Sequence, residues 1–250
     1  MKHSLAFSLL IISALGLHIS GQTPKSGSQE LLQKLTRHSS MPSGDLNGLP
    51  ESAAMQMRRE TRETRWKPST KFNVSDPAEQ ETVEFAFVDS VNVLERGQKP
   101  DPNGLPVSST AIVIGTVKSA KAFAKQDRTN VYSDYQVTVD ETLKQDSQLP
   151  IVTGKQIVAY MPGGTIRFSS GHVVHYLISG RGFPEVGSQY VFFLERKDSQ
   201  ILEYEINTGY LLENGVIEPM DGTGDSPGWF SGTKTSDFLV KLQKAIAGGR

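Results

Sequence analysis

The 250-residue chain contains no cysteine. Without thiols it can form neither disulfide bonds nor thiolate metal sites, and it offers no cysteine as a nucleophile or as the attachment point of a lipid anchor. An excess of charge of one sign is lacking too, because 26 Lys and Arg residues stand against 27 Asp and Glu residues. This balance argues against a nucleic-acid partner, which a basic excess would favour.

Long apolar runs are also rare, and the one that stands out covers residues 5–19. It follows the positively charged start Met1-Lys2-His3 and precedes small and polar residues, an order typical of a secretory signal peptide. The run is shorter than the roughly 20 residues of a transmembrane helix. We therefore expect a signal peptide over residues 1–21, cleavage near Gly21, a secreted or periplasmic location and no integral membrane span in the mature protein. An uncleaved N-terminal anchor is the alternative interpretation.

Residues 22–82 are poor in β-branched and aromatic side chains and rich in polar ones. Such a segment buries too little apolar surface to offset its conformational entropy, which predicts a disordered or partly helical linker. Capping residues and prolines predict short helices at 28–35 and 51–66 within it.

From Val83 onward, short apolar runs alternate with turn residues, a pattern typical of strands. The predicted strands cover residues 83–88, 111–117, 135–139, 157–161, 173–178, 190–194, 203–206, 210–213 and 216–218. The run 111–117 is continuously apolar and is therefore expected to be buried on both faces, whereas Tyr135, Val137 and Val139 alternate with polar residues. Asn214-Gly215 predicts a type I′ turn between the last two strands.

A helix is predicted over residues 237–247, with an apolar stripe that packs on the β-domain. The stripe consists of Phe238, Leu239, Leu242 and Ile246. Many short strands with a single terminal helix favour a sandwich or a small barrel, and glycines at 163–164 and 180–182 suit bent strands that turn barrel corners. We expect a β-barrel domain over residues 83–222, then a loop and docked helix over 223–250.

Residues 105–219 resemble a pattern that recurs in exported bacterial proteins. The shared elements are Ile114-Gly115-Thr116-Val117, Tyr132-Ser133-Asp134-Tyr135, Pro162-Gly163-Gly164 and Pro184-Glu185-Val186-Gly187. Their order is similar to that of OB-type Greek-key barrels of netrin-like and metalloproteinase-inhibitor domains. The resemblance implies a mainly β fold: a small OB-like barrel with a C-terminal helix and a largely disordered or short-helical N-terminal region. The inhibitors bind a protease zinc through an N-terminal cysteine, a mechanism that a cysteine-free chain does not share.

The sequence contains few residue patterns that suggest catalysis or metal binding. His172 and His175 are three residues apart in a strand-like segment, so their side chains point to opposite faces and are not expected to share a metal. Ser170 precedes His172 closely, but no Gly-x-Ser-x-Gly motif occurs and closeness in sequence does not make a catalytic triad. The acidic loop that begins at Asp221 suits a turn better than a calcium site. We expect no metal and no cofactor.

A ligand-binding face is the remaining possibility, because OB barrels bind ligands along one face and its flanking loops. The predicted face consists of Tyr132, Tyr135, Arg167, His172, Tyr176 and Arg181. Aromatic rings beside cations can stack on sugars, although the tyrosines could instead belong to the barrel wall. The leading hypothesis is a non-enzymatic exported module that binds a protein or glycan in the cell envelope, or supports the envelope itself. The alternatives are a hydrolase or metal-dependent enzyme using His172, His175 and nearby acids, and a protease-inhibitor-like module.

Overall fold

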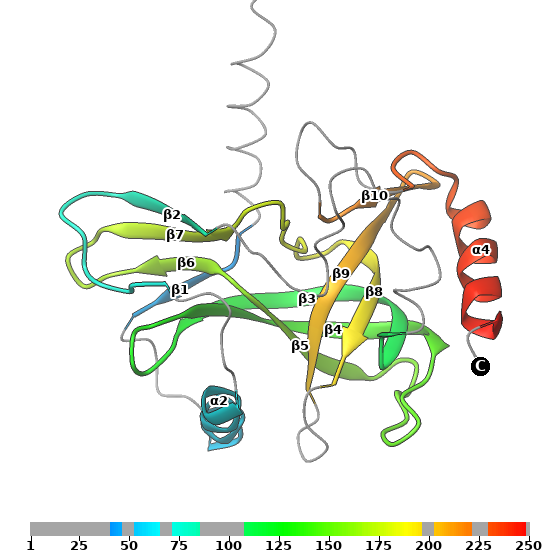
Figure 1. Ribbon diagram of the computed structural model, residues 1–250, viewed down its shortest axis with the longest axis horizontal. Coiled ribbons are helices and arrows are strands. Elements are labelled where there is room, and N and C mark those ends of the chain that lie inside the picture. Colours follow the sequence, from blue (N-terminus) through cyan, green and yellow to red (C-terminus); the bar gives the residue numbers. More distant parts are fainter. Residues whose placement is uncertain are drawn as a thin grey trace, which may run out of the picture.

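The structure, a computed structural model, describes residues 41–46, 53–65, 72–85, 108–196, 203–221 and 230–248. These residues form a mainly β protein with two sheets and a C-terminal helix (Figure 1). The expected signal peptide and the helix expected at 28–35 lie outside the described residues. Within the described part of the chain, no helix combines the length and apolar character that crossing a membrane requires.

The larger sheet nearly closes on itself. Its order is β10-β9-β5-β4-β3-β8, and β9 also pairs with β8, so that the pairing leads from β3 through β4, β5, β9 and β8 back to β3. The pairs are antiparallel except β5 with β9, which is parallel. The strands are β3 (Ala111–Ala124), β4 (Val131–Lys144), β5 (Gln156–Pro162), β8 (Gln189–Glu195), β9 (Glu203–Glu213) and β10 (Val216–Pro219).

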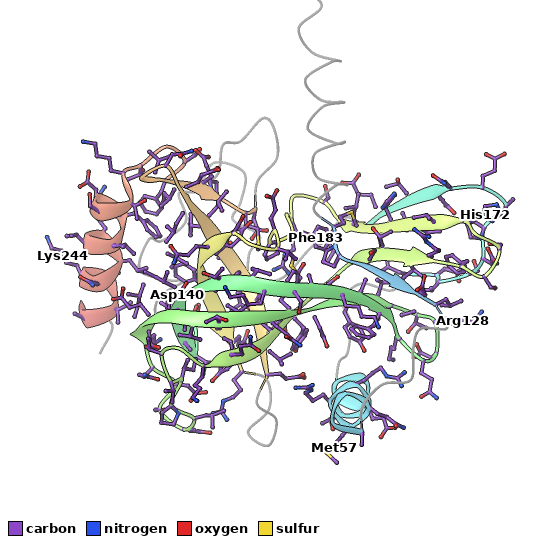
Figure 2. All side chains as sticks on the ribbon, turned by 180° about the vertical axis from the view of Figure 1, so that it is seen from behind. Met57, Arg128, Asp140, His172, Phe183 and Lys244 are labelled. Carbon is purple, nitrogen blue, oxygen red and sulfur yellow. The ribbon has the colours of Figure 1, made fainter. Side chains whose placement is uncertain are left out.

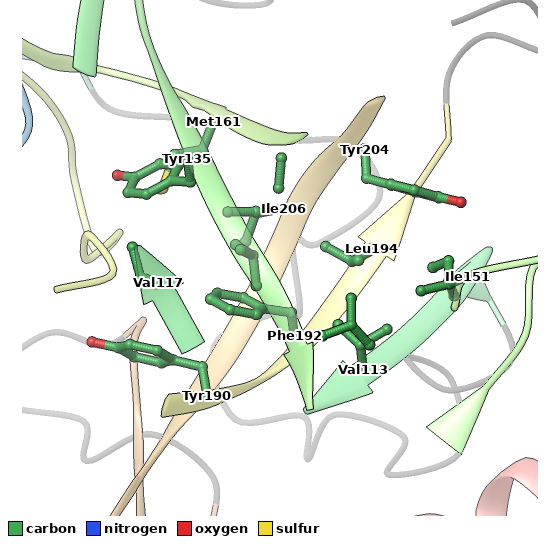
Figure 3. Close-up of a cluster of buried hydrophobic side chains, with 14 of the residues drawn as sticks. Val113, Val117, Tyr135, Ile151, Met161, Tyr190, Phe192, Leu194, Tyr204 and Ile206 are labelled. Carbon is green, nitrogen blue, oxygen red and sulfur yellow. The ribbon is translucent and has the colours of Figure 1, made fainter. Parts of the chain in front are cut away.

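Apolar side chains fill the space that this sheet encloses. Val113, Phe192, Leu194 and Ile206 are each fully buried there (Figure 3). Alternate side chains of a strand point to opposite faces, so each strand contributes every second residue to this interior. The strands that the sequence predicted in this region are confirmed, and the runs 203–206 and 210–213 join into the single strand β9.

A second, smaller sheet has the order β1-β6-β7-β2. Its strands are β1 (Ser43–Asp45), β2 (Glu81–Phe85), β6 (Gly164–Arg167) and β7 (Val173–Ile178). The outer strands β1 and β2 each run parallel to their neighbour in the antiparallel β6–β7 hairpin. The strand β6 was not predicted from the sequence, β1 was assigned to the linker, and the strand predicted at 83–88 corresponds to β2, which begins two residues earlier.

The far ends of β3 and β4 extend beyond the larger sheet, and the smaller sheet covers them. Ala122 of β3 and Val131 of β4 are buried against Ile166 and Tyr176 of the smaller sheet. Gly44 of β1 sits so close to β3 that a Cβ atom there would lie 1.9 Å from the carbonyl oxygen of Ala122. The β3–β4 hairpin therefore belongs to both hydrophobic cores.

Parts of the segment that was predicted as a linker contribute to the folded structure. Phe72 and Val74 are each 1% exposed and pack under the smaller sheet, and Met41 is 7% exposed in the main core. The helix predicted at 51–66 is confirmed as α2 (Ala53–Arg65). Met41, Phe72 and Val74 thus tie parts of this polar segment to the two cores.

The C-terminal helix α4 (Thr235–Gly248) packs on the outer face of the larger sheet. Phe238 and Leu242 are buried against Ile112 and Ile114 of β3, which confirms the predicted apolar stripe. The helix thereby buries the second face of β3 and accounts for the continuously apolar run 111–117. The turn between β9 and β10 has positive φ at both Asn214 (52°) and Gly215 (77°), as the predicted type I′ turn requires.

Candidate ligand-binding cleft

The β3–β4 hairpin ends in a tightly bonded turn. Within it, the Lys125 amide donates to the Asn130 carbonyl at 2.7 Å, and the Arg128 amide donates to the Lys125 carbonyl at 2.9 Å. The Asp127 carboxylate accepts hydrogen bonds from Thr129 and pairs with the Lys125 ammonium at 2.7 Å. The bond from Lys125, followed by that from the Thr129 side chain, lowers the pKa of Asp127 to about 2. Asp127 is therefore ionised at neutral pH, and its charge is already balanced.

Arg128 occupies the left-handed backbone region in this turn, with φ of 56°. That region favours glycine, and a residue with a Cβ atom adopts it at a cost of about 1–2 kcal/mol. The Arg128 carbonyl accepts a hydrogen bond of 3.0 Å from the Val74 amide, whereas its side chain is exposed to solvent. Its guanidinium group forms no ion pair or hydrogen bond with any described residue.

Residues 72–76 run past this turn in an extended conformation. Phe72 and Val74 point inward and are buried, whereas Asn73 and Ser75 point outward and are exposed. The Phe72 ring meets the Tyr176 ring edge-on, with 5.3 Å between the centroids. This anchoring holds the Asn73 amide and the Ser75 hydroxyl at the surface, where neither has a partner among the described residues.

The segment ends at Asp76, which is fastened to the turn between β6 and β7. The Ser170 hydroxyl donates to Asp76 Oδ1 at 2.6 Å, and the Ser170 Oγ accepts the His172 amide at 3.3 Å. His172 Nδ1 lies 3.6 Å from Asp76 Oδ1, which is too long for a hydrogen bond. In a catalytic triad the serine donates to the histidine, whereas here the serine proton is held by the carboxylate. The arrangement fastens two loops together.

Between the hairpin turn and residues 72–76 lies an open cleft of about 430 Å³, here called the hairpin cleft. Its lining consists of Phe72, Asn73, Val74, Ser75, Asp76, Asp127, Arg128 and Thr129. Arg128 and His172 lie at the same end of the molecule, opposite α4 (Figure 2). The cleft thus offers an amide, a hydroxyl and a guanidinium group that are not engaged by the fold.

The three tyrosines of the predicted binding face lie in the interior. Tyr132 is 1% exposed, and Tyr135 and Tyr176 are fully buried. Figure 3 shows the Tyr135 ring among the core side chains of the larger sheet. Burial raises the pKa of Tyr135 well above its usual value and raises that of Tyr176 to about 12. In this conformation the rings stabilise the cores and do not form a surface on which a sugar could stack.

Arg181, also predicted for that face, supports the backbone of β9. Its guanidinium donates hydrogen bonds of 2.8 Å to the carbonyl oxygens of both Ile206 and Asn207. These carbonyls lie where β9 shifts its register with β8, and a shift of this kind leaves backbone groups outside the regular ladder. Arg181 supplies the missing donors, and its side chain is largely buried.

The remaining predicted residues flank the turn between β6 and β7. Arg167 is exposed at the end of β6, and His172 borders the cleft through Asp76. His175 lies on β7, where its Nδ1 is 2.9 Å from the Thr165 hydroxyl. The two histidines therefore have different neighbours, and among the described residues no three His, Asp or Glu side chains form a group that could hold a metal ion.

Sequence analysis missed the hairpin cleft, because Asn73, Asp76 and Arg128 come from segments read as linker or as ordinary turn. Each of the two segments that line the cleft does carry a local sequence pattern. Phe72 and Val74 are separated by one polar residue, which is the alternation of an anchored extended segment, and the polar run that starts at Asp127 marks a turn between two strands. Neither pattern indicates that the two segments meet.

Comparisons with known proteins add no functional assignment to this geometry. A scan against protein-family models finds no match for the chain, and a search of curated proteins finds no relative.

Proposed function

We propose that the chain is an exported, non-enzymatic module that binds a glycan in the hairpin cleft. The observation that carries the proposal is the set of unengaged polar groups on Asn73, Ser75 and Arg128 around a cleft of about 430 Å³. Ligand sites commonly have volumes of ~300–1,000 Å³ and a few polar groups that fix the orientation of the ligand. Sugar hydroxyl groups can both donate to and accept from an amide and a hydroxyl.

A glycan suits the exposed surface better than a protein partner. Protein interfaces bury about 800 Å² on each side and have apolar anchors at their centre. The large apolar residues that are well exposed in the described part of the chain are Met57, Val152, Val186 and Val240. They belong to different segments, namely α2, two loops and α4, so they supply single contacts and not a shared anchor.

We further propose that the near-closed sheet is an OB-type barrel. In chain order its strands are β3, β4, β5, β8 and β9, and the last two exchange places around the ring, as expected for a five-stranded Greek key. The turn at 125–130 then joins the first and second strands. In OB folds, this loop is one of those that bind oligosaccharides or oligonucleotides. The absence of a basic excess favours the former.

Export is the part of the proposal that depends on the first 21 residues alone. Expression of the full chain in a bacterial host, followed by mass measurement of the recovered protein, tests it. Recovery outside the cytoplasm with an N-terminus near Gln22 supports export, and recovery of the intact chain from the cytoplasm contradicts it.

Binding is tested with the exported protein on a glycan array. We expect a discrete set of glycans to bind and Asn73→Ala to weaken their binding, because the amide at the cleft is lost. Gln243→Ala, at an exposed position on α4, is the matched control and should bind normally. An array without hits, or hits that Asn73→Ala leaves unchanged, would count against a glycan site in the cleft.

A serine hydrolase is the second candidate, because Ser170, Asp76 and His172 do meet at the edge of the cleft. For this activity the Ser170 hydroxyl would have to turn from Asp76 to the His172 ring. A fluorophosphonate probe, which labels activated serines, distinguishes the two candidates. Labelling that is lost in Ser170→Ala supports the hydrolase, and an unlabelled native protein supports the binding module.

A further inference from the structure

The charged side chains that line the hairpin cleft differ in whether they have a partner within the protein. Its two carboxylates already have partners: Asp127 is paired with Lys125 at 2.7 Å, and Asp76 accepts the Ser170 hydroxyl at 2.6 Å. The guanidinium of Arg128 has no partner among the described residues. Asp76 keeps its negative charge, since a hydroxyl donor does not neutralise a carboxylate, and Arg128 is the cation of the lining that has no partner among the described residues. Its guanidinium has the planar, forked shape that matches a carboxylate.

The backbone around Arg128 gives no reason for an arginine. Its φ of 56° would suit glycine at lower cost, and the hydrogen bonds of residue 128 in the turn use only its amide and carbonyl groups. The side chain is not needed for the turn, and it lies on the lining of the cleft. Arg128 shares the lining of the cleft with Asn73 and Ser75, so ligand recognition is a use that its side chain could serve.

We propose that the hairpin cleft recognises an acidic sugar residue, with Arg128 binding its carboxylate. This inference rests on the proposed function and narrows it from glycans in general to those that carry uronate-type carboxylates. Arg128 forms the bidentate pair, while Asn73 and Ser75 bind the neighbouring hydroxyl groups. A charge-assisted pair of this kind is roughly twice as strong as a neutral hydrogen bond, so the carboxylate decides which glycans bind.

The probe is a short oligogalacturonate, compared with the same oligosaccharide after methyl esterification of its carboxylates. The two differ in charge but keep their ring hydroxyls. By calorimetry with the full exported protein, we expect the acid to bind at least about tenfold more tightly than the ester, given the usual strength of charged hydrogen bonds.

Two substitutions of Arg128 separate binding from folding. Arg128→Gly removes the guanidinium and suits the left-handed backbone, so the protein should fold normally and lose the preference for the acid. Arg128→Lys keeps the charge without the fork and should weaken acid binding severalfold. Lys244→Gln, on α4 at the opposite end of the molecule (Figure 2), is the control and should change nothing.

The outcomes distinguish the acidic-sugar inference from the broader proposal that the cleft binds a glycan. Equal binding of acid and ester that Asn73→Ala weakens would overturn the acidic-sugar inference and leave a glycan site in place. Acid binding that Arg128→Gly does not affect would also overturn the inference. If acidic peptides bind at the cleft and neither sugar does, both the inference and the glycan function fall.

Discussion

The buried ion pair between Asp146 and Arg196 gives the sharpest test of how the larger sheet is stabilised. The Asp146 side chain is 1% exposed and that of Arg196 is 7% exposed, with 2.5 Å between Arg196 Nε and Asp146 Oδ2. Arg196 Nη2 also donates to Asp146 Oδ1 at 3.2 Å. Asp146 Oδ1 accepts the backbone amides of Gln148 and Leu149 as well. The pair thus fastens the loop after β4 to the end of β8.

Arg196→Met keeps most of the side-chain volume and removes the positive charge. The carboxylate then stays buried with two backbone donors and no counter-ion, which typically costs about 3–5 kcal/mol. Domains of this size have total stabilities of roughly 5–15 kcal/mol, so the variant should lose a large share of its stability. Urea unfolding followed by fluorescence measures the change, with an unchanged slope indicating that both proteins unfold in the same way.

The double variant Arg196→Met/Asp146→Asn is the matched control. Removing both charges leaves no unpaired ion, and the asparagine carbonyl can still accept the amides of Gln148 and Leu149. We expect it to be more stable than Arg196→Met alone, with a coupling of about 1–3 kcal/mol between the sites. A loss below about 1 kcal/mol for Arg196→Met would refute the reasoning, because a desolvated carboxylate cannot lose its counter-ion so cheaply.

Three further predictions concern other parts of the structure. Phe72→Ala should lower the free energy of unfolding by about 3–5 kcal/mol, because a ring that is 1% exposed leaves a cavity; a loss near zero by urea unfolding would mean that residues 72–85 are not part of the cooperative fold. Arg128→Gly should raise the melting temperature, since relief of a left-handed residue is worth about 1 kcal/mol, and a lowered melting temperature by calorimetry would show that the side chain stabilises the turn. Burial raises the pKa from 10.0 to about 12 for four tyrosines, Tyr176, Tyr190, Tyr204 and Tyr210. As the pH rises, the unfolded chain therefore loses these phenol protons before the folded protein does. The stability that the buried tyrosines contribute is complete below pH 10 and is lost between pH 10 and 12. Absorbance at 295 nm should therefore show tyrosine ionisation that coincides with unfolding, and an independent titration near pH 10 would contradict the burial.

The strands of the larger sheet could be predicted because their residues carry a local signal. Apolar runs such as the one around Phe192 are stable only when they are buried. The turn at Asn214-Gly215 is specified by its two residues. Local patterns do not specify which interior a residue joins. The run 111–117 was expected to be buried on both faces, but the sequence did not indicate that Ile114 lies under α4 on the outer face, because the helix comes from a distant part of the chain.

The candidate site was harder to predict for the same reason. Tyr135 alternates with polar residues in phase with Val137, and the apolar side of such a pattern faces the core. Its assignment to a binding face rested on ring stacking beside cations, whereas the alternative of a wall residue agrees with its burial. The residues that do line the hairpin cleft come from two segments more than fifty positions apart, Asn73 and Arg128 among them. Their meeting depends on Phe72 and Val74 reaching the core under the smaller sheet, and no short stretch of sequence encodes that contact.

The β3–β4 hairpin has a mechanical consequence. Both strands run from the core of the larger sheet into that of the smaller one, with Val117 and Val137 in the first and Ala122 and Val131 in the second. On the way their pairing shifts register between Val117 and Ser119. Two bodies that share continuous strands cannot hinge freely about each other, since any rotation would have to bend the ladder itself. A change at the hairpin tip, where Arg128 lies, would therefore act on both cores through the same two strands. If a ligand occupies the proposed site at this tip, we expect any effect on the larger sheet to run along β3 and β4, where hydrogen exchange would measure it.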